Sequence, residues 1–179
     1  MRMLGLPFTC IPAMIDETPG QGLSPREVAE ELAQRKALAV AGRAEAGVAR
    51  WIVGADTIVV LDGEIIGKPE NRDEARQMLS RLAGRRHEVI TAMALYNRQN
   101  GRTDCRCVSC EVDFAPLSEA EIEWYLDSGE WKGAAGAYRL HETGGCLIQS
   151  INGSPSAVAG LPLHAFYAML RDNGYQYGA

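Results

Sequence analysis

The sequence predicts an α/β fold with a mixed, strongly twisted sheet, and three observations support this. A nearly continuous apolar, β-branched run at 51–61 is typical of a central strand buried on both faces. Two long alternating runs at 87–98 and 103–114 are joined through Asn100-Gly101, a strong hairpin signal that excludes a purely parallel sheet. Segments with helical capping signals and helical periodicity lie between these strands.

Capping signals place the helices. Ser24-Pro25-Arg26-Glu27 combines a serine N-cap, a proline at the first helical position and a glutamate three residues after the cap. The other expected helix starts are Asn71, Ser118 and Pro162, and the expected stops are Gly84, Gly129 and Asn173-Gly174. Further strand candidates are 7–11, 136–140 and 146–151.

Length and composition describe one ordinary globular domain spanning 1–179. The apolar fraction is 46% and the net charge is −5, so the protein as a whole repels nucleic acid. No apolar run approaches the roughly 20 residues that span a bilayer, and the first residues do not form a signal peptide. We therefore expect a cytoplasmic protein without nucleic-acid or membrane partners, and the sequence indicates a homodimer only weakly.

The five cysteines indicate reduced thiols, because their number is odd and no secretory signal precedes them. Cys105, Cys107 and Cys110 could suggest zinc. They lie in an alternating stretch, where Cys105 and Cys107 share one strand face and Cys110 points to the other. No fourth ligand follows at a suitable spacing, so small buried side chains are the favoured interpretation.

Asp56 is the most informative residue, because it interrupts the apolar run at 51–61. Burying an unpaired carboxylate costs several kcal/mol, so Asp56 needs a nearby cation or a set of hydrogen bonds. One alternative is a structural role, in which backbone N–H groups at a bulge near Gly54 satisfy the carboxylate. The other is chemistry, with Lys68 reaching back toward the same end of the sheet, although a simple ion pair fits equally.

An acidic loop and several cations could complete a phosphate site. Asp16-Glu17 would be solvated in most loops, but with Asp56 it could supply oxygen ligands for Mg²⁺, which takes one or two protein carboxylates plus substrate phosphates. The cations suited to phosphate are Lys36, Lys68 and Arg72. For those on helices, a solvated helix face is the alternative. No Walker-type or G-x-G-x-x-G loop is present, so side chains, a metal and turn amides would hold the phosphates.

Taken together, these segments resemble the Maf family, the septum-formation-inhibitor proteins known as nucleotide pyrophosphatases. Each segment alone is common, whereas the ordered set across nearly the whole chain is highly specific. The segments include Gly5-Leu6-Pro7-Phe8, Asp16-Glu17, Lys36-Ala37, Gly54-Ala55-Asp56-Thr57, Gly67-Lys68-Pro69, His87-Glu88-Val89-Ile90-Thr91, Gly136-Ala137-Tyr138, Ile151-Asn152-Gly153-Ser154 and Gly160-Leu161-Pro162-Leu163.

The resemblance implies an elongated, two-lobed fold of the inosine-triphosphatase-like type. It also implies hydrolysis of a nucleoside triphosphate to monophosphate and pyrophosphate with a divalent metal, Mg²⁺ or Mn²⁺. Asp56 would accept the proton of the attacking water and, with Glu17, hold the metal, while Lys36 and Lys68 would neutralise the triphosphate. Thr57 matches the branch that acts on dTTP and UTP. Such a reaction needs charge neutralisation and a positioned water more than covalent chemistry.

The chain departs from the family pattern at three places. The family's first strand and Ser-x-Ser-Pro-Arg-Arg loop are absent, for which the hypothesis is a start codon assigned too late. A family lysine is replaced by Ala134, with Lys132 two residues away. In a loop this shift could still deliver the charge, whereas in a strand it would move the ammonium about 7 Å. His141 stands where the family has a glutamine that helps to read the base, which affects the expected specificity more than the reaction class.

These departures leave rival hypotheses. The main rival is a non-catalytic nucleotide-binding relative involved in cell-division arrest, which would bind nucleotide without releasing pyrophosphate. A third hypothesis, a zinc or redox protein, rests on Cys105, Cys107 and Cys110 alone.

Overall fold

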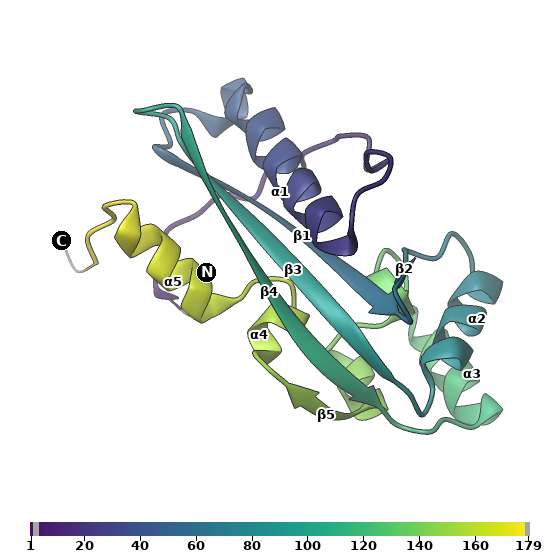
Figure 1. The fold of residues 1–179 in the computed structure, drawn as a ribbon. Coiled ribbons are helices and arrows are strands. Elements are labelled where there is room, and N and C mark those ends of the chain that lie inside the picture. Colours follow the sequence, from purple (N-terminus) through teal and green to yellow (C-terminus); the bar gives the residue numbers. More distant parts are fainter. Residues whose placement is uncertain (2–3, 178–179) are drawn as a thin grey trace. The chain divides into compact units, whose positions relative to one another are not determined.

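The computed structural model describes residue 1 and residues 4–177, which form an α/β fold around a five-stranded sheet (Figure 1). The strands are β1 (Trp51–Leu61), β2 (Glu64–Ile66), β3 (Arg86–Asn97), β4 (Arg102–Phe114) and β5 (Ile148–Asn152), in the order β2-β1-β3-β4-β5. The α-helices are α1 (Pro25–Ala41), α2 (Arg72–Leu82), α3 (Glu119–Ser128), α4 (Pro155–Val158) and α5 (Leu163–Asp172). Short 3₁₀ helices are η2 (Ala44–Ala46), η3 (Ala135–Ala137) and η4 (Glu142–Leu147). The expected α/β class is confirmed.

Tight turns set the strand pairing. β1 and β2 pair antiparallel, with Val59 opposite Ile66, and the turn between them consists of Asp62 and Gly63, both at positive φ. Gly101 is also at positive φ in the turn between β3 and β4, so the Asn-Gly hairpin is confirmed. β4 and β5 pair antiparallel as well, with a register irregularity at the end of β4.

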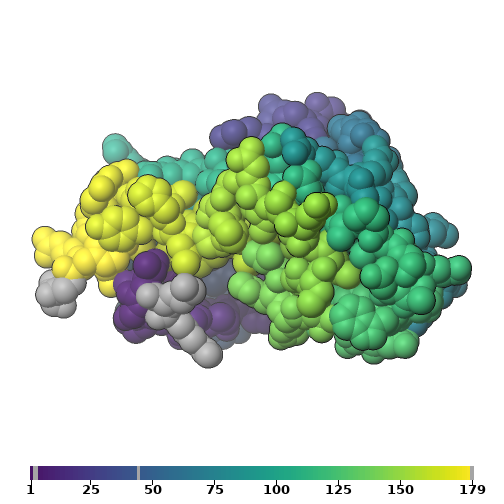
Figure 2. All heavy atoms as spheres, turned by 90° about the horizontal axis from the view of Figure 1, so that it is seen from below, coloured from purple at the N-terminus to yellow at the C-terminus, as the bar shows by residue number. Residues whose placement is uncertain are grey.

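The chain divides into two compact units. The first contains Met1–Asp56, Ala92–Cys107 and Leu163–Ala179, and the second contains Thr57–Thr91 and Val108–Pro162. In the first unit, the N-terminal stretch lies beside α5, as the purple and yellow parts of Figures 1 and 2 show. A hydrophobic core cluster belongs to the second unit. Fully buried members of this cluster are Leu79, Leu82, Phe114 and Tyr125.

Local capping follows the sequence. Ser24 and Ser118 both form complete capping boxes, with Glu27 and Glu121 respectively, and Asn71 caps α2. Gly129 ends α3 in the left-handed conformation. The expected helix starts at Ser24, Asn71 and Ser118 and the expected stop at Gly129 are therefore confirmed.

Two strand predictions are wrong. Residues 7–11 are not in a strand, because no neighbouring segment of the described chain pairs with them. Residues 136–140 include part of η3 instead, because Gly136 adopts positive φ and donates its N–H to the carbonyl of Gly67 at 2.9 Å. The strand expected at 146–151 is present as β5. Among the described residues, no helix has both the length and the apolar character needed to cross a membrane.

Candidate active site

In the first unit, α1 packs closely against β1 at Gly54, and this contact positions the residues of the candidate site. A Cβ atom at Gly54 would overlap the carbonyl oxygen of Ala33 and lie 2.6 Å from the backbone nitrogen of Ala37. Only glycine therefore allows the helix to pack at this distance from the strand. Gly54 therefore serves a helix–strand contact within β1.

This contact brings Lys36 of α1 to Asp56 of β1. The Lys36 Nζ atom lies 2.5 Å from Asp56 Oδ1 and 2.8 Å from Glu17 Oε1. The Asp56 side chain is 6% exposed and that of Lys36 is 17% exposed, whereas Glu17 is 40% exposed. Three of the expected site residues, Glu17, Lys36 and Asp56, are thus brought together around one ammonium group.

The electrostatics of Lys36 reflect two opposing effects. Burial alone would lower the pKa of Lys36, because desolvation disfavours the charged form. The hydrogen bonds and charges of Asp56 and Glu17 outweigh burial and raise the pKa above its usual value. Lys36 is therefore a permanent cation in this site and holds two carboxylates close to each other.

Two arginines of the first unit hold the acidic loop that carries Glu17. Arg35 donates to the backbone carbonyl oxygens of Asp16 and, at 2.9 Å, Thr18. Arg43 donates to the carbonyl oxygen of Pro12 at 2.5 Å and to that of Ala13 at 3.1 Å. Because these are charge-assisted bonds to backbone, they fix the path of the loop more than its side chains. Asp16 itself accepts from Thr18 and does not reach Lys36.

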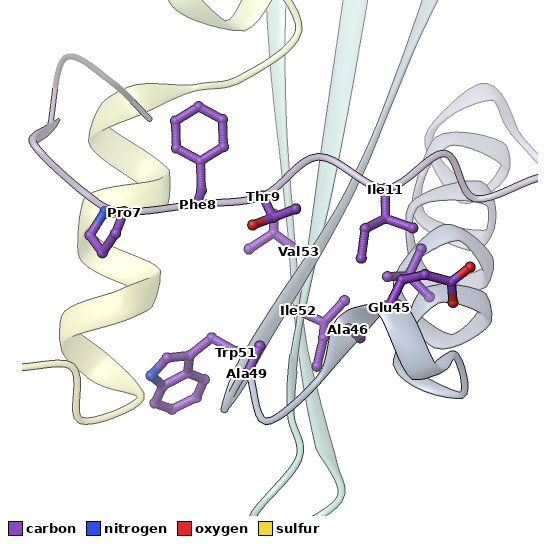
Figure 3. Close-up of a pocket in the computed structure, with 11 residues that line it drawn as sticks. Pro7, Phe8, Thr9, Ile11, Glu45, Ala46, Ala49, Trp51, Ile52 and Val53 are labelled. Atoms are coloured by element: carbon purple, nitrogen blue, oxygen red, sulfur yellow. The ribbon is translucent and has the colours of Figure 1, made fainter.

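Two adjoining cavities lie in this part of the first unit. One, of about 430 Å³, is lined by residues of the loop at 11–17, Lys36, Val40 and Val53–Ala55. The other, of about 350 Å³, lies between residues 7–11 and the start of β1, with Ile11 pointing toward Ile52 in Figure 3. The first cavity gives the Lys36 and Glu17 side chains access to a ligand, and the second is lined by apolar residues together with Thr9 and Glu45.

The remaining expected residues belong to the second unit. Thr57 is half-buried, and its Oγ1 atom lies 2.8 Å from Thr91 Oγ1. Lys68 is exposed and directly follows β2, in a segment that is tied to η3 through the Gly67 carbonyl. His141 is exposed at the start of η4 and forms no side-chain cap there. These positions leave the expected roles of Thr57, Lys68 and His141 as predictions.

Other candidates have different roles. Arg72 donates to Glu123 at 2.8 Å and to Asp127 at 2.6 Å, so it links α2 to α3. Lys132 lies in a turn with its ammonium 5.7 Å from the Trp131 ring centroid, and Ala134 is buried.

Cys105, Cys107 and Cys110 all lie in β4, as the alternating sequence pattern predicts. Cys110 is buried, while Cys105 and Cys107 are half-buried. Among the described residues, no group of three or more His, Cys, Asp or Glu side chains could hold a metal ion.

The carboxylates nevertheless fit a cation that is shared with a substrate. Glu17 and Asp56 both lie within hydrogen-bonding distance of one ammonium, so their oxygens are close enough to approach one divalent ion. Mg²⁺ commonly takes only one or two protein carboxylates and completes its shell with water and phosphate oxygens. The donor set is therefore suited to Mg²⁺ or Mn²⁺ in the presence of a nucleotide.

Comparison with known proteins identifies the family. The sequence profile described as Maf-like protein matches residues 1–173. The chain belongs to the Maf-like family. This Maf-like protein is 44% identical over 178 residues to a dTTP/UTP pyrophosphatase of Symbiobacterium thermophilum, covering 98% of this chain and 88% of the relative. It is 41% identical over 175 residues to a dTTP/UTP pyrophosphatase of Pelotomaculum thermopropionicum, covering 98% and 90%. The resemblance found in the sequence is confirmed.

Sequence reasoning missed several contacts that position the candidate residues of this Maf-like protein. Thr91 is fully buried in β3 and joins the hydroxyl of Thr57 to the backbone of α4, which no local pattern shows. At Gly54 the sequence pattern allows a bulge as one alternative, although a glycine inside an apolar strand also signals a close backbone approach. The loop contacts of Arg35 and Arg43 have no sequence signal, because their partners are backbone carbonyls far along the chain.

Proposed function

We propose that this Maf-like protein hydrolyses dTTP and UTP to the monophosphate and pyrophosphate. The observation that carries the proposal is the cluster of Glu17, Lys36 and Asp56 in a protein whose close relatives are named dTTP/UTP pyrophosphatases. A buried carboxylate beside a fixed ammonium is an arrangement suited to proton transfer next to a polyanion. A purely structural ion pair would not require a second carboxylate on the same ammonium.

Each residue has a definite task in this proposal. Asp56 accepts the proton of the attacking water, and its low exposure keeps bulk solvent away from the carboxylate. Lys36 holds Asp56 in place and, with Lys68, neutralises negative charge on the triphosphate. Thr57 contacts the nucleotide, and His141 affects which base is preferred.

A divalent cation completes the proposal. Mg²⁺ or Mn²⁺ held by Glu17 and Asp56 would supply electrostatic stabilisation of the phosphate oxygens. We place the activity in the cytoplasm, where nucleoside triphosphates are made and used, and the nucleotide is the partner that the site requires.

The test is metal-dependent release of pyrophosphate from dTTP, UTP, CTP and 7-methyl-GTP. We expect turnover of dTTP and UTP by the wild-type protein and a fall in kcat of about 100-fold or more in Asp56→Asn, because a positioned general base contributes this much. Asp62→Asn is the matched control, since Asp62 is an exposed turn residue paired with Arg85 and asparagine tolerates its positive φ. The control should retain full turnover.

Two outcomes would contradict the proposal. Unchanged kcat in Asp56→Asn would remove Asp56 from the role of base. Saturable nucleotide binding by the folded wild-type protein, without pyrophosphate release from any of the four nucleotides at any divalent metal concentration, would instead support the non-catalytic relative.

A further inference from the structure

We propose that His87 and Tyr138 are positioning residues for Lys68, because their hydrogen bond holds η3 in the conformation that binds the peptide group in front of this lysine. The inference rests on the proposed function, since that proposal gives Lys68 the task of neutralising the triphosphate. All the residues that carry it belong to the second unit.

The peptide group between Gly67 and Lys68 is held by η3. The Gly136 N–H donates to the carbonyl oxygen of Gly67 at 2.9 Å. Because a peptide group is planar, a bond to this oxygen also sets the orientation of the N–H that begins Lys68. On the other side, the buried Pro69 restricts Lys68 to extended backbone conformations. The backbone of Lys68 is therefore fixed from both sides, which determines where its exposed side chain starts.

η3 reaches Gly67 in an uncommon backbone conformation. Gly136 and Ala137 are consecutive residues at positive φ, +66° and +62°, and alanine rarely adopts such a value because of its Cβ atom. A Cβ at Gly136 would lie 3.1 Å from a methyl group of Val59, so η3 also packs tightly against β1. A strained segment of this kind relaxes unless its surroundings hold it. The anchor for η3 is the residue that follows it, Tyr138.

Tyr138 ties the end of η3 to β3. Its hydroxyl lies 2.7 Å from Nε2 of His87. The rings of His87, Tyr138 and Phe114 pack edge-on, with centroids 4.9 to 5.7 Å apart. Both members of the hydrogen bond are buried, so water does not compete for it. A continuous series of contacts thus runs from His87 through Tyr138 and η3 to the peptide group of Lys68.

Core stability alone does not account for the imidazole of His87. Its Nδ1 atom is buried without a hydrogen-bond partner among the described residues, and an unpaired buried polar atom destabilises the folded state. An apolar side chain of similar size would fill the same space without this penalty. What the imidazole adds is a hydrogen bond that fixes the direction of the Tyr138 phenol. This favours positioning as the role of the pair.

Binding of inorganic pyrophosphate with Mg²⁺, measured by calorimetry, tests the link without requiring turnover. Tyr138→Phe removes only the hydroxyl, and we expect Kd to rise by about tenfold for the lost hydrogen bond. His87→Leu should show the same rise. His87→Gln keeps a hydrogen-bonding atom near the position of Nε2 and should restore most of the affinity.

A Lys68→Ala background separates positioning from a general loss of stability. Lys68→Ala should itself weaken pyrophosphate binding, and adding Tyr138→Phe should then cause no further rise in Kd, because the ammonium that Tyr138 positions is gone. A tenfold effect of Tyr138→Phe that persists in full in this background would assign Tyr138 to the fold alone and overturn the inference.

Ile122→Val is the matched control. Ile122 is buried in α3 of the same unit, and its truncation lowers stability without altering the contacts between His87 and Lys68. Its Kd for pyrophosphate should equal that of the wild-type protein. A tenfold rise in Ile122→Val as well would show that any loss of stability weakens binding, and it would contradict the positioning role.

Turnover separates this inference from the proposed function. The kcat/KM for UTP should fall in Tyr138→Phe in parallel with the affinity for pyrophosphate. A protein that hydrolyses no nucleotide but shows the Lys68-dependent change in binding would refute the activity and keep the positioning role. Wild-type affinity for pyrophosphate in folded Tyr138→Phe and His87→Leu, or in Lys68→Ala, would overturn the positioning role whatever the activity.

Discussion

At the scale of single residues, His87 shows how the second unit fixes a protonation state. Its Nε2 atom lies 2.7 Å from the Tyr138 hydroxyl, and its ring packs edge-on against Phe114 and Tyr138. Its Nδ1 atom has no hydrogen-bond partner among the described residues. Burial lowers the pKa of His87 from 6.5 to about 4, against a smaller opposing effect of Asp113. The imidazole is therefore neutral at physiological pH.

This burial predicts a pH-dependent stability. The unfolded chain binds a proton at His87 near pH 6.5 and the folded protein only near pH 4, so the unfolded state holds more protons in between. The free energy of unfolding should thus fall as pH is lowered from 7 to 4, by about 3 kcal/mol from this residue alone. Urea unfolding at several pH values measures the free energy of unfolding of the wild-type protein and of His87→Gln. The stability advantage of the wild-type protein over His87→Gln should shrink toward pH 4.

His164→Gln is the control for this experiment, because His164 is exposed and its replacement should change the free energy of unfolding by less than about 0.5 kcal/mol. A His87→Gln profile that runs parallel to that of the wild-type protein from pH 7 to pH 4 would show that folding does not lower the pKa of His87.

At the scale of elements, the packing of α1 on β1 determines where Lys36 lies. Gly54→Ala places a Cβ against the backbone of Ala33 and Ala37, which cannot yield as a flexible side chain would. We expect a loss of about 1–3 kcal/mol in the free energy of unfolding, which is typical of overpacking. Displacement of Lys36 from Asp56 should also lower kcat. Thermal unfolding and pyrophosphate release measure the two effects.

Gly42→Ala is the matched control, since Gly42 has a negative φ and nothing within 4 Å of a Cβ. Its stability and kcat should stay at the wild-type level. Equal stability of Gly54→Ala and Gly42→Ala would mean that α1 does not approach β1 as closely as the structure has it.

Elements encoded by adjacent residues could be predicted from the sequence. The boxes at Ser24 and Ser118 use side chains three residues apart, and the hairpin turn needs only Asn100-Gly101. Asp56 could be found as a site residue because a charge inside an apolar strand is anomalous without a partner.

Features that depend on distant partners could not be predicted. Gly136 adopts positive φ to reach the Gly67 carbonyl, so the segment expected as a strand turns into a 3₁₀ helix. Lys36 meets Asp56 across 20 residues of chain because of Gly54, and the sequence singled out Lys68 as the partner instead. Periodicity and capping carry no information about such contacts.

At the scale of the whole molecule, the candidate residues and the hydrophobic core are distributed unequally over the two units. Glu17, Lys36 and Asp56 belong to the first unit, while the hydrophobic core cluster around Leu79 and Phe114 lies within the second. Three strands nevertheless contribute residues to both units, since β1, β3 and β4 each extend across a boundary between the ranges of the two units. A continuous strand cannot lose its order in one half without weakening the other half. The two units should therefore unfold together.

Core truncation in the second unit tests this cooperativity. Leu79 is 0% exposed within the cluster, so Leu79→Ala should lower the free energy of unfolding by about 2–5 kcal/mol. Leu38→Ala on the exposed face of α1, where the side chain is 49% exposed, should cost less than about 1 kcal/mol. In Leu79→Ala, amide hydrogen exchange should accelerate by the same factor in the slowest amides of α1 and α2, because both open through global unfolding. Acceleration confined to the second unit, with α1 still protected as in the wild-type protein, would instead identify the units as separate folding units and the candidate site as independent of the main core.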